Sequence, residues 1–229
     1  MPSCEFPSNC PGEVLLSKKE DFMKKIRNDD LGGTLKRRHI CLFYDSQKDL
    51  LELAIPYFVE GLRANDLCMW VVSDLGIKGA KAALSKKVKN LDKYIKKGQL
   101  EIISYNDWYF KSGKFNPKKV LTGWAEKEKQ ASRQGFNGLR ASGDVSWLQK
   151  KDWDKWINYE SILDKTIEKH KLTALCTYPL DKFDLSDIFI LSKNHRFAFS
   201  NKNGQWHILK NIKMNNLMAN IKYYISDNR

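Results

Sequence analysis

The chain has 229 residues, 42% of them hydrophobic, and a formal net charge of +13 at pH 7. Its length and apolar content fit one α/β domain with a sizeable core and small appendages. No apolar run approaches the roughly 18 residues of a membrane span, and the segment before Gly12 lacks the pattern of a secretory signal. We therefore exclude a membrane protein and expect a cytoplasmic one.

The excess of positive charge is spread along the chain in pairs such as Lys18–Lys19, Lys86–Lys87 and Lys150–Lys151. Scattered lysines are typical of a solvated surface. The alternative is an electrostatic surface for nucleic acid or another anionic partner, although the sequence contains no recognisable nucleic-acid-binding motif.

Residues 1–38 are predicted to be an N-terminal extension with one short amphipathic helix, "KKEDFMKKIRN". Cys4 and Cys10 fall in this extension at a spacing that matches no standard zinc pattern. A flexible tail is the plainer interpretation, and a metal or disulfide role is the alternative. The other three cysteines sit in apolar runs, where cysteine is usually a small buried hydrophobe.

From His39 the pattern becomes a regular alternation of strands and helices. "HICLFY" predicts a buried strand, and "DLLELAIPYFVEGL" predicts a helix that Ser46 and Asp49 begin as a capping box and that Pro56 kinks. "LCMWVVS" is a second buried strand, residues 78–96 are a lysine-rich helix and "QLEIISY" is a third strand. Continuous apolar strands of this kind are typical of a sheet covered on both faces.

"NDWYFKSGKF" follows as an aromatic loop, and Asn116 with Pro117 begins the next helix. Beyond it the sequence predicts a strand in "FNGLRASGDVSW", a helix over 152–170, a strand in "LTALCTYP", a short helix in "SDIFILSKNH" and a hairpin in "RFAFSNKNGQWHIL". This order favours a mainly parallel sheet with right-handed crossovers. The main domain is predicted over residues 39–209, and a C-terminal helix over 210–229.

The turn after "HICLFY" is where a phosphate-binding loop would lie. A P-loop requires glycines, whose freedom lets backbone N–H groups converge on phosphate. Here the turn reads "YDSQKDLLE": it has Lys48 but no glycine, and Asp45 and Asp49 would repel a phosphate. The sequence therefore predicts that nucleotide is not hydrolysed in the P-loop manner.

Several blocks, in order, resemble the MEDS domain, a sensory domain of methanogens and methylotrophs that is related to RecA-like ATPases. They are "HICLFYDSQKDLLELAIPYFVEGL", "CMWVVSD", "ISYNDWYFKSGKFNPKKVL", "GFNGLRASGDVSWL", "YESIL" and "ALCTYPLDKF". The resemblance spans about residues 39–200. It implies a RecA-like three-layer α/β sandwich with a mainly parallel central sheet and a degenerate nucleotide loop, here followed by a C-terminal hairpin and helix.

The resemblance also implies a function, which is to sense a small organic molecule, either methylotrophic or hydrocarbon-derived. Members of the family are often fused to DNA-binding or kinase modules, and no such module is recognisable in this sequence. We therefore expect a cytoplasmic sensory domain that signals through a partner protein or as a homo-oligomer. The alternative is a basic nucleic-acid-associated transcriptional regulator.

In open α/β sheets, ligands bind at the carboxyl ends of the strands. Here those ends carry aromatic side chains with a few polar groups, which suits a modest organic ligand, and the loop over 106–116 is expected to close over them. Core packing is the alternative for the aromatic residues, and helix capping for Asp45 and Ser46. The predicted ligand-binding residues are Tyr44, Asp45, Ser46, Trp108, Arg140, Ser142, Asp144, Trp147, Glu160 and Tyr178.

Arg140 is the least ordinary residue of this set. Strand alternation separates it from Leu139 and Ala141 and leaves it near the interior of a doubly covered sheet. A buried arginine requires a partner. Glu160 falls inside the apolar stripe of the following helix, so we predict an Arg140–Glu160 ion pair that holds this helix to the sheet or also faces a polar ligand group.

No arrangement in the sequence points to catalysis. The motifs G-x-S-x-G, H-E-x-x-H and C-x-x-C are absent. The four histidines are scattered, and no carboxylates cluster with them along the chain. We therefore expect no catalytic residues, no metal site, no cofactor and no enzyme activity.

Overall fold

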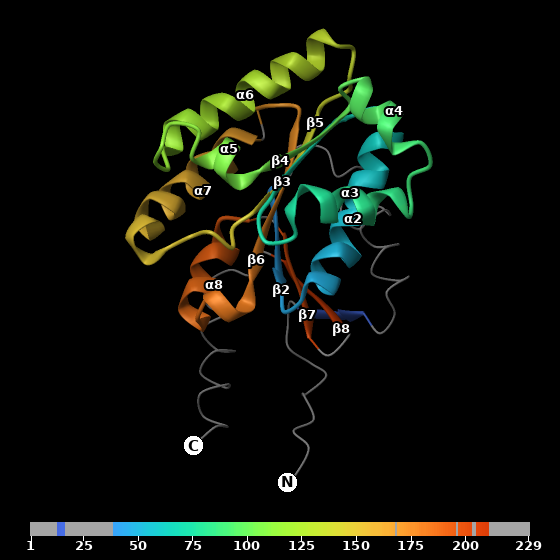
Figure 1. Cartoon of the computed structure of the whole chain (residues 1–229). Helices are drawn as coiled ribbons and strands as arrows, with labels where there is room; N and C mark the ends of the chain where they lie inside the picture. Colours follow the sequence, from blue (N-terminus) through green and yellow to red (C-terminus); the bar gives the residue numbers. More distant parts are fainter. Residues whose placement is uncertain (1–12, 17–38, 168, 196, 203–204, 211–229) are drawn as a thin grey trace, which may run out of the picture.

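The computed structural model describes residues 13–16, 39–167, 169–195, 197–202 and 205–210. Within them an eight-stranded sheet forms in the order β1-β8-β7-β2-β6-β5-β3-β4 (Figure 1). The strands are β1 (Glu13–Leu16), β2 (His39–Tyr44), β3 (Leu67–Val72), β4 (Leu100–Ser104), β5 (Leu139–Asp144), β6 (Leu172–Pro179), β7 (Phe197–Lys202) and β8 (Gln205–Lys210).

The six strands from β7 to β4 run parallel to their neighbours. β8 returns antiparallel to β7, and β1 pairs antiparallel with β8. The predicted mainly parallel sheet and the C-terminal hairpin are thus both confirmed. β2 lies inside the sheet, between β6 and β7, and all six of its residues are buried.

Helices cover both faces of the sheet, as the unbroken apolar strands predict (Figure 1). One face carries α2 (Gln47–Arg63), α3 (Gly76–Ser85) and α4 (Leu91–Lys96). The other carries α5 (Tyr105–Tyr109), α6 (Pro117–Arg133), α7 (Trp153–Ile167) and α8 (Leu185–Lys193). Alternate residues of each strand enter separate cores: Leu42 faces α2, whereas Cys41 and Phe43 face α7.

Local sequence signals fix where most helices begin. The Ser46 hydroxyl accepts from the Asp49 N–H, and the Asp49 carboxylate accepts from the Ser46 N–H, which is the predicted capping box of α2. Asn116 caps α6 through the Lys119 N–H at 3.1 Å. Each cap satisfies backbone donors that a helix N-terminus leaves free.

Two predicted elements differ in the structure. The single helix over 78–96 is two helices, because Asn90 takes a left-handed conformation with φ of 56° between α3 and α4. The aromatic loop begins as the short helix α5, which Ser104 caps through the Asn106 N–H.

The ends of the chain were predicted only in part. β1 adds to the sheet from residues expected to form a separate extension. Lys210 ends β8 instead of beginning the predicted C-terminal helix. The rest of that helix over 211–229, the helix predicted over 18–28, Cys4 and Cys10 lie outside the described residues. No described helix is long and apolar enough to cross a membrane, and the expected cytoplasmic location stays a prediction.

Candidate functional site

The ten predicted ligand-binding residues do not form one group. Alternation along β5 places Arg140, Ser142 and Asp144 on the face covered by α2, where the Tyr44 side chain also lies. Trp108, Trp147, Glu160 and Tyr178 belong to the opposite face, under α6 and α7. Asp45 and Ser46 are exposed in the turn between β2 and α2. The sheet therefore separates the polar residues near Asp144 from most of the aromatic ones.

The polar residues near the end of β5 centre on Asp144, which is buried. Its carboxylate accepts hydrogen bonds from the Ser146 N–H at 2.9 Å and the Tyr44 hydroxyl at 3.3 Å. Burial raises the pKa of Asp144 to about 6, and the Ser146 N–H opposes this rise. The same burial raises the pKa of Tyr44, with Asp144 adding to the shift.

The raised pKa of Asp144 predicts a measurable pH dependence. Because the folded state holds the Asp144 proton more tightly than the unfolded chain, its ionisation costs stability as pH rises from about 4 to about 7. Relative to that of Asp144→Asn, the free energy of unfolding of the parent protein should fall by roughly 2–3 kcal/mol over this range. Urea unfolding of both proteins at several pH values measures the difference. A constant difference would mean that Asp144 is not buried as an acid.

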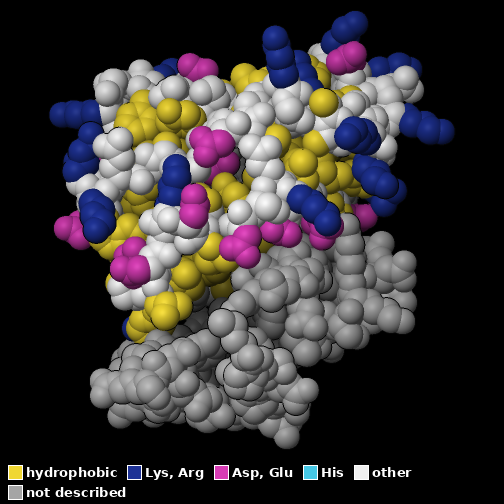
Figure 2. All heavy atoms as spheres, turned by 60° about the horizontal axis from the view of Figure 1, so that its bottom comes forward, with side chains coloured by type: hydrophobic (Ala, Val, Ile, Leu, Met, Phe, Trp, Pro, Cys, Tyr) yellow, Lys and Arg dark blue, Asp and Glu magenta, His cyan; other side chains and the backbone are white. Residues whose placement is uncertain are grey.

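Acidic groups gather where the parallel strands end. Asp45, Asp74 and Asp181 are exposed there, and Asp74 and Asp181 both act on the pKa of Tyr44. Figure 2 turns this end of the molecule forward and shows Asp and Glu side chains across its centre, with Lys and Arg mainly around the margin. Such a surface disfavours a phosphate ligand.

The aromatic residues on the α7 face pack against one another. The Trp147 ring lies 5.0 Å from Tyr109, 5.2 Å from Phe115 and 5.4 Å from Trp156, measured between ring centroids. The Trp156 indole N–H donates to the Tyr178 hydroxyl at 3.2 Å. The expected open box beneath a loop is therefore largely filled by side chains.

A small cavity remains beside this packing. Its volume is about 10 Å³, close to the room needed for one water molecule. It is lined by Tyr109, Trp124, Gly143, Tyr159 and Cys176, together with aliphatic residues of β5, β6 and α7. Nearby, the Trp147 and Trp108 indole N–H groups are buried and have no hydrogen-bond partner among the described residues. The region thus combines apolar walls with free donors.

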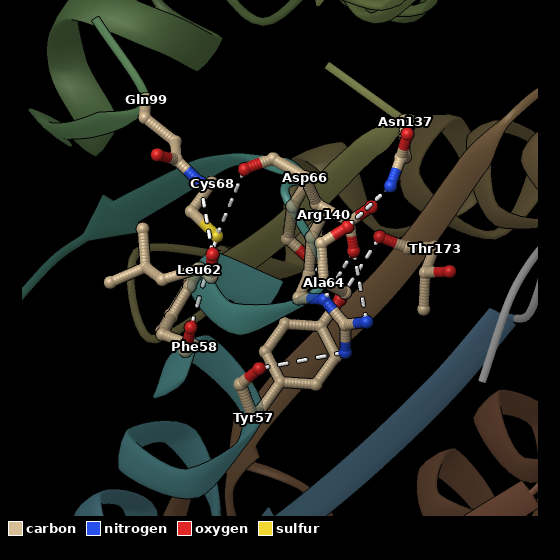
Figure 3. Close-up of polar contacts among 11 residues, drawn as sticks. Tyr57, Phe58, Leu62, Ala64, Asp66, Cys68, Gln99, Asn137, Arg140 and Thr173 are labelled. Carbon is tan, nitrogen blue, oxygen red and sulfur yellow. Dashed lines mark hydrogen bonds and ion pairs between the residues drawn. The ribbon is translucent and has the colours of Figure 1, made fainter. Parts of the chain in front are cut away.

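Arg140 does not pair with Glu160, and that prediction is wrong. The Arg140 Nε and Nη2 atoms each lie 3.0 Å from Asp66 Oδ2, and the guanidinium stacks over the Tyr57 ring (Figure 3). Gly61 permits this packing, since a Cβ there would lie 2.3 Å from Arg140 Cδ. The partner differs because Arg140 points to the α2 face, whereas α7 covers the other. A structural ion pair exists, but it joins β5 to the turn between α2 and β3.

Glu160 instead belongs to a buried group that the sequence analysis missed. Its Oε2 atom lies 3.0 Å from His39 Nε2 and 3.1 Å from His195 Nε2, and Cys176 Sγ lies 3.5 Å from His39 Nε2. We call these four residues the His–Glu–Cys cluster. They come from β2, α7, β6 and the segment after α8, so spacing along the chain gives no sign of them. Two signals were available: Glu160 falls inside the apolar stripe of α7, and strand alternation places His39 on the same face as Cys41.

Known proteins place the chain in a family. A model of the family described as "MEthanogen/methylotroph, DcmR Sensory domain" matches residues 38–196. The chain belongs to the MEDS family. The predicted resemblance is confirmed, and with it a sensory role for the domain.

Two kinds of relative accompany this MEDS match. The chain is 29% identical over 164 residues to a protein named transcriptional repressor DcmR from Methylorubrum extorquens; the match covers 70% of this chain and 59% of that repressor's length. A KaiC-like protein from Pyrococcus horikoshii superposes with a TM-score of 0.52 at 12% identity, covering 74% of this chain and 73% of the other. The flagellar accessory protein FlaH from Methanocaldococcus jannaschii has a TM-score of 0.48 at 13% identity over 87% of both chains.

The likeness to the KaiC-like protein concerns the fold, because so low an identity carries no residue roles. With the six-stranded parallel sheet covered on both faces, it confirms the predicted RecA-like three-layer architecture. The MEDS chain keeps this frame, and between β2 and α2 it has Asp45 and Ser46, with Asp49 in the first turn of α2 and no glycine among residues 45–49.

Proposed function

We propose that this MEDS domain binds a small, largely apolar organic molecule between residues 105–116 and the α7 face of the sheet. The observation that supports it is the cavity beside Gly143, walled by aromatic side chains. The proposal moves the expected ligand away from Arg140, which Asp66 already engages. It also places the ligand across the sheet from Asp144.

The cavity is too small for an organic molecule as it stands, so binding would displace an aromatic ring. Trp147 is the best candidate, because it is only partly buried and contacts both Phe110 near the surface and Trp156 inside. Its movement would change the surface around residues 105–116. We propose that a partner protein or a second copy of the chain recognises that change.

We also propose that the domain signals without hydrolysing nucleotide. The Ser46 hydroxyl, which begins α2, is hydrogen-bonded to Asp49 at 2.7 Å. The Asp45 and Asp49 carboxylates flank Lys48, and further acids gather nearby. These groups oppose a triphosphate where a P-loop would cradle it.

Tryptophan fluorescence during a screen of small methylated and halogenated compounds tests the proposal. We expect at least one compound to change the emission of the parent protein. Trp70→Phe is the control, because it removes an indole from the core facing α2, and its emission should change in the same way. The change should be lost in Trp147→Phe. ATP and GTP should leave the emission unchanged. A screen in which no compound acts, or in which only nucleotides act, would refute the proposed function.

A second candidate function is that of a nucleic-acid-associated transcriptional regulator. The net charge of +13 and the name of the Methylorubrum relative favour it. Binding to DNA fragments over a salt series would test it, because phosphate contacts weaken steeply as salt rises. No binding at low salt would remove this candidate.

A further inference from the structure

The His–Glu–Cys cluster brings together four side chains of the types that bind transition metals. One ligand atom from each residue lies within 4.8 Å of the others, and all four residues are buried. Around a tetrahedral zinc ion, with bonds of about 2.0–2.1 Å to N or O and about 2.3 Å to S, neighbouring ligand atoms lie roughly 3.3–3.5 Å apart. The distances of 3.0, 3.1 and 3.5 Å within the cluster approach those values.

Backbone carbonyls hold the Nδ1 atoms of both imidazoles, whose rings lie side by side with centroids 3.9 Å apart. His39 Nδ1 lies 2.9 Å from the Asn194 carbonyl, and His195 Nδ1 lies 2.8 Å from the Leu191 carbonyl. A carbonyl can only accept, so each Nδ1 carries the hydrogen and donates it. Backbone carbonyls commonly hold metal-binding histidines in this way. In the neutral imidazoles, each Nε2 therefore carries a lone pair, and both Nε2 atoms lie close to Glu160 Oε2, at 3.0 and 3.1 Å.

A neutral arrangement without an ion leaves acceptors facing one another. Both Nε2 atoms approach the same Glu160 oxygen, and neither oxygen of Glu160 has a well-directed hydrogen bond from the described residues. Protonating both histidines would supply hydrogens, but it would set two buried positive charges against one buried carboxylate, Glu160, and the half-exposed Asp164 carboxylate, whose Oδ1 lies 3.4 Å from His39 Nδ1. A divalent ion with a thiolate, a carboxylate and two neutral imidazoles sums to zero charge, which burial favours.

We propose that the His–Glu–Cys cluster binds a divalent transition-metal ion of the zinc class. Two imidazoles and a thiolate suit Zn²⁺, Co²⁺ or Fe²⁺, whereas Mg²⁺ and Ca²⁺ prefer oxygen ligands. The ion would join β2 to β6, α7 and the end of α8. This site is independent of the proposed organic ligand, although Cys176 also borders the cavity.

Titration with Co²⁺ tests the site in the full chain. The double substitution Cys4→Ser and Cys10→Ser first removes the two N-terminal thiols. We expect one Co²⁺ per chain, with the visible bands of a four-coordinate ion and a thiolate charge-transfer band. Zn²⁺ should displace it, and Mg²⁺ and Ca²⁺ should not. A folded protein that gives no thiolate band would overturn the proposal.

Two matched variants assign the thiolate. Cys176→Ser should abolish the charge-transfer band and weaken Co²⁺ binding by at least about 100-fold, since even residues that only support a ligand are worth 10- to 100-fold. Cys41 is a free, buried cysteine that lies opposite Cys176 in the register of β2 and β6 but does not belong to the cluster. Cys41→Ser should therefore preserve the band. If Cys41→Ser loses the band and Cys176→Ser keeps it, the proposed ligand set is wrong.

Zinc-edge X-ray absorption of the Zn²⁺-loaded parent chain, again without Cys4 and Cys10, does not depend on how the cluster variants fold. We expect one sulfur at about 2.3 Å and three lighter ligands at about 2.0–2.1 Å. A shell without sulfur, or with several sulfurs, would contradict the His–Glu–Cys cluster as the site.

Discussion

Substituting Asp66 with Asn is expected to lower the free energy of unfolding by about 3–5 kcal/mol. Asp66 and Arg140 are both buried, and the Asp66 carboxylate accepts from two guanidinium nitrogens. The variant keeps the shape of the side chain but leaves the arginine charge without its counterion in a low-dielectric setting. Urea unfolding followed by far-ultraviolet circular dichroism measures the loss.

The chain offers a matched control for this prediction. Glu60 pairs with Arg63 on the exposed side of α2, at 2.9 Å with side chains 37% and 69% exposed. Glu60→Gln should change stability by less than about 1 kcal/mol, because water screens the pair. Substituting Arg140 with Met in addition to Asp66→Asn should recover part of the loss, since no buried charge then remains. Equal effects of Asp66→Asn and Glu60→Gln would show that the Arg140 pair contributes no more than a surface pair.

Gly143→Ala is expected to lower the free energy of unfolding by crowding the contact between β5 and α5. A Cβ at this position would lie 2.1 Å from the Tyr109 hydroxyl oxygen. Either α5 or the strand must shift, and overpacking of this kind costs about 1–3 kcal/mol, sometimes more. The loss should appear as a lower urea midpoint with an unchanged slope.

A double-mutant cycle identifies the clash. Tyr109→Phe removes the hydroxyl, and the next Tyr109 atom, Cζ, lies 3.4 Å from the added Cβ, which is an ordinary contact. Gly143→Ala should therefore cost much less in the Tyr109→Phe background. Gly79→Ala is the control, because there the Cβ meets only the flexible Leu75 side chain. Additive effects of the Gly143 and Tyr109 changes would rule out the clash.

The order of strands and helices could be predicted from the sequence, because it depends on short-range patterns. Ser46 and Asn116 cap helices that begin at the next residue, and each apolar strand is recognisable from its own residues. The break at Asn90 was missed because an isolated left-handed asparagine carries a weak local signal within a lysine-rich run.

The candidate site was harder to predict, because it depends on which helix covers which face. Strand alternation correctly predicted that Arg140 is buried, and the apolar stripe of α7 correctly predicted the same for Glu160. The two residues nevertheless lie on opposite faces of the sheet. Their partners, Asp66 and His39, are more than 70 residues distant along the chain. The aromatic residues were recognised as a group, but only packing decides whether such rings line a space or fill it.

The position of β2 between β6 and β7 has a consequence for how the chain folds during synthesis. β2 is among the first core segments made, yet both of its neighbours follow more than 120 residues later. At about 5–20 residues per second, the apolar segment "HICLFY" waits on the order of 10 s for a partner. β3, β4 and β5 can pair before then. The sheet would thus assemble from that half, while β2 remains a segment for chaperones to protect.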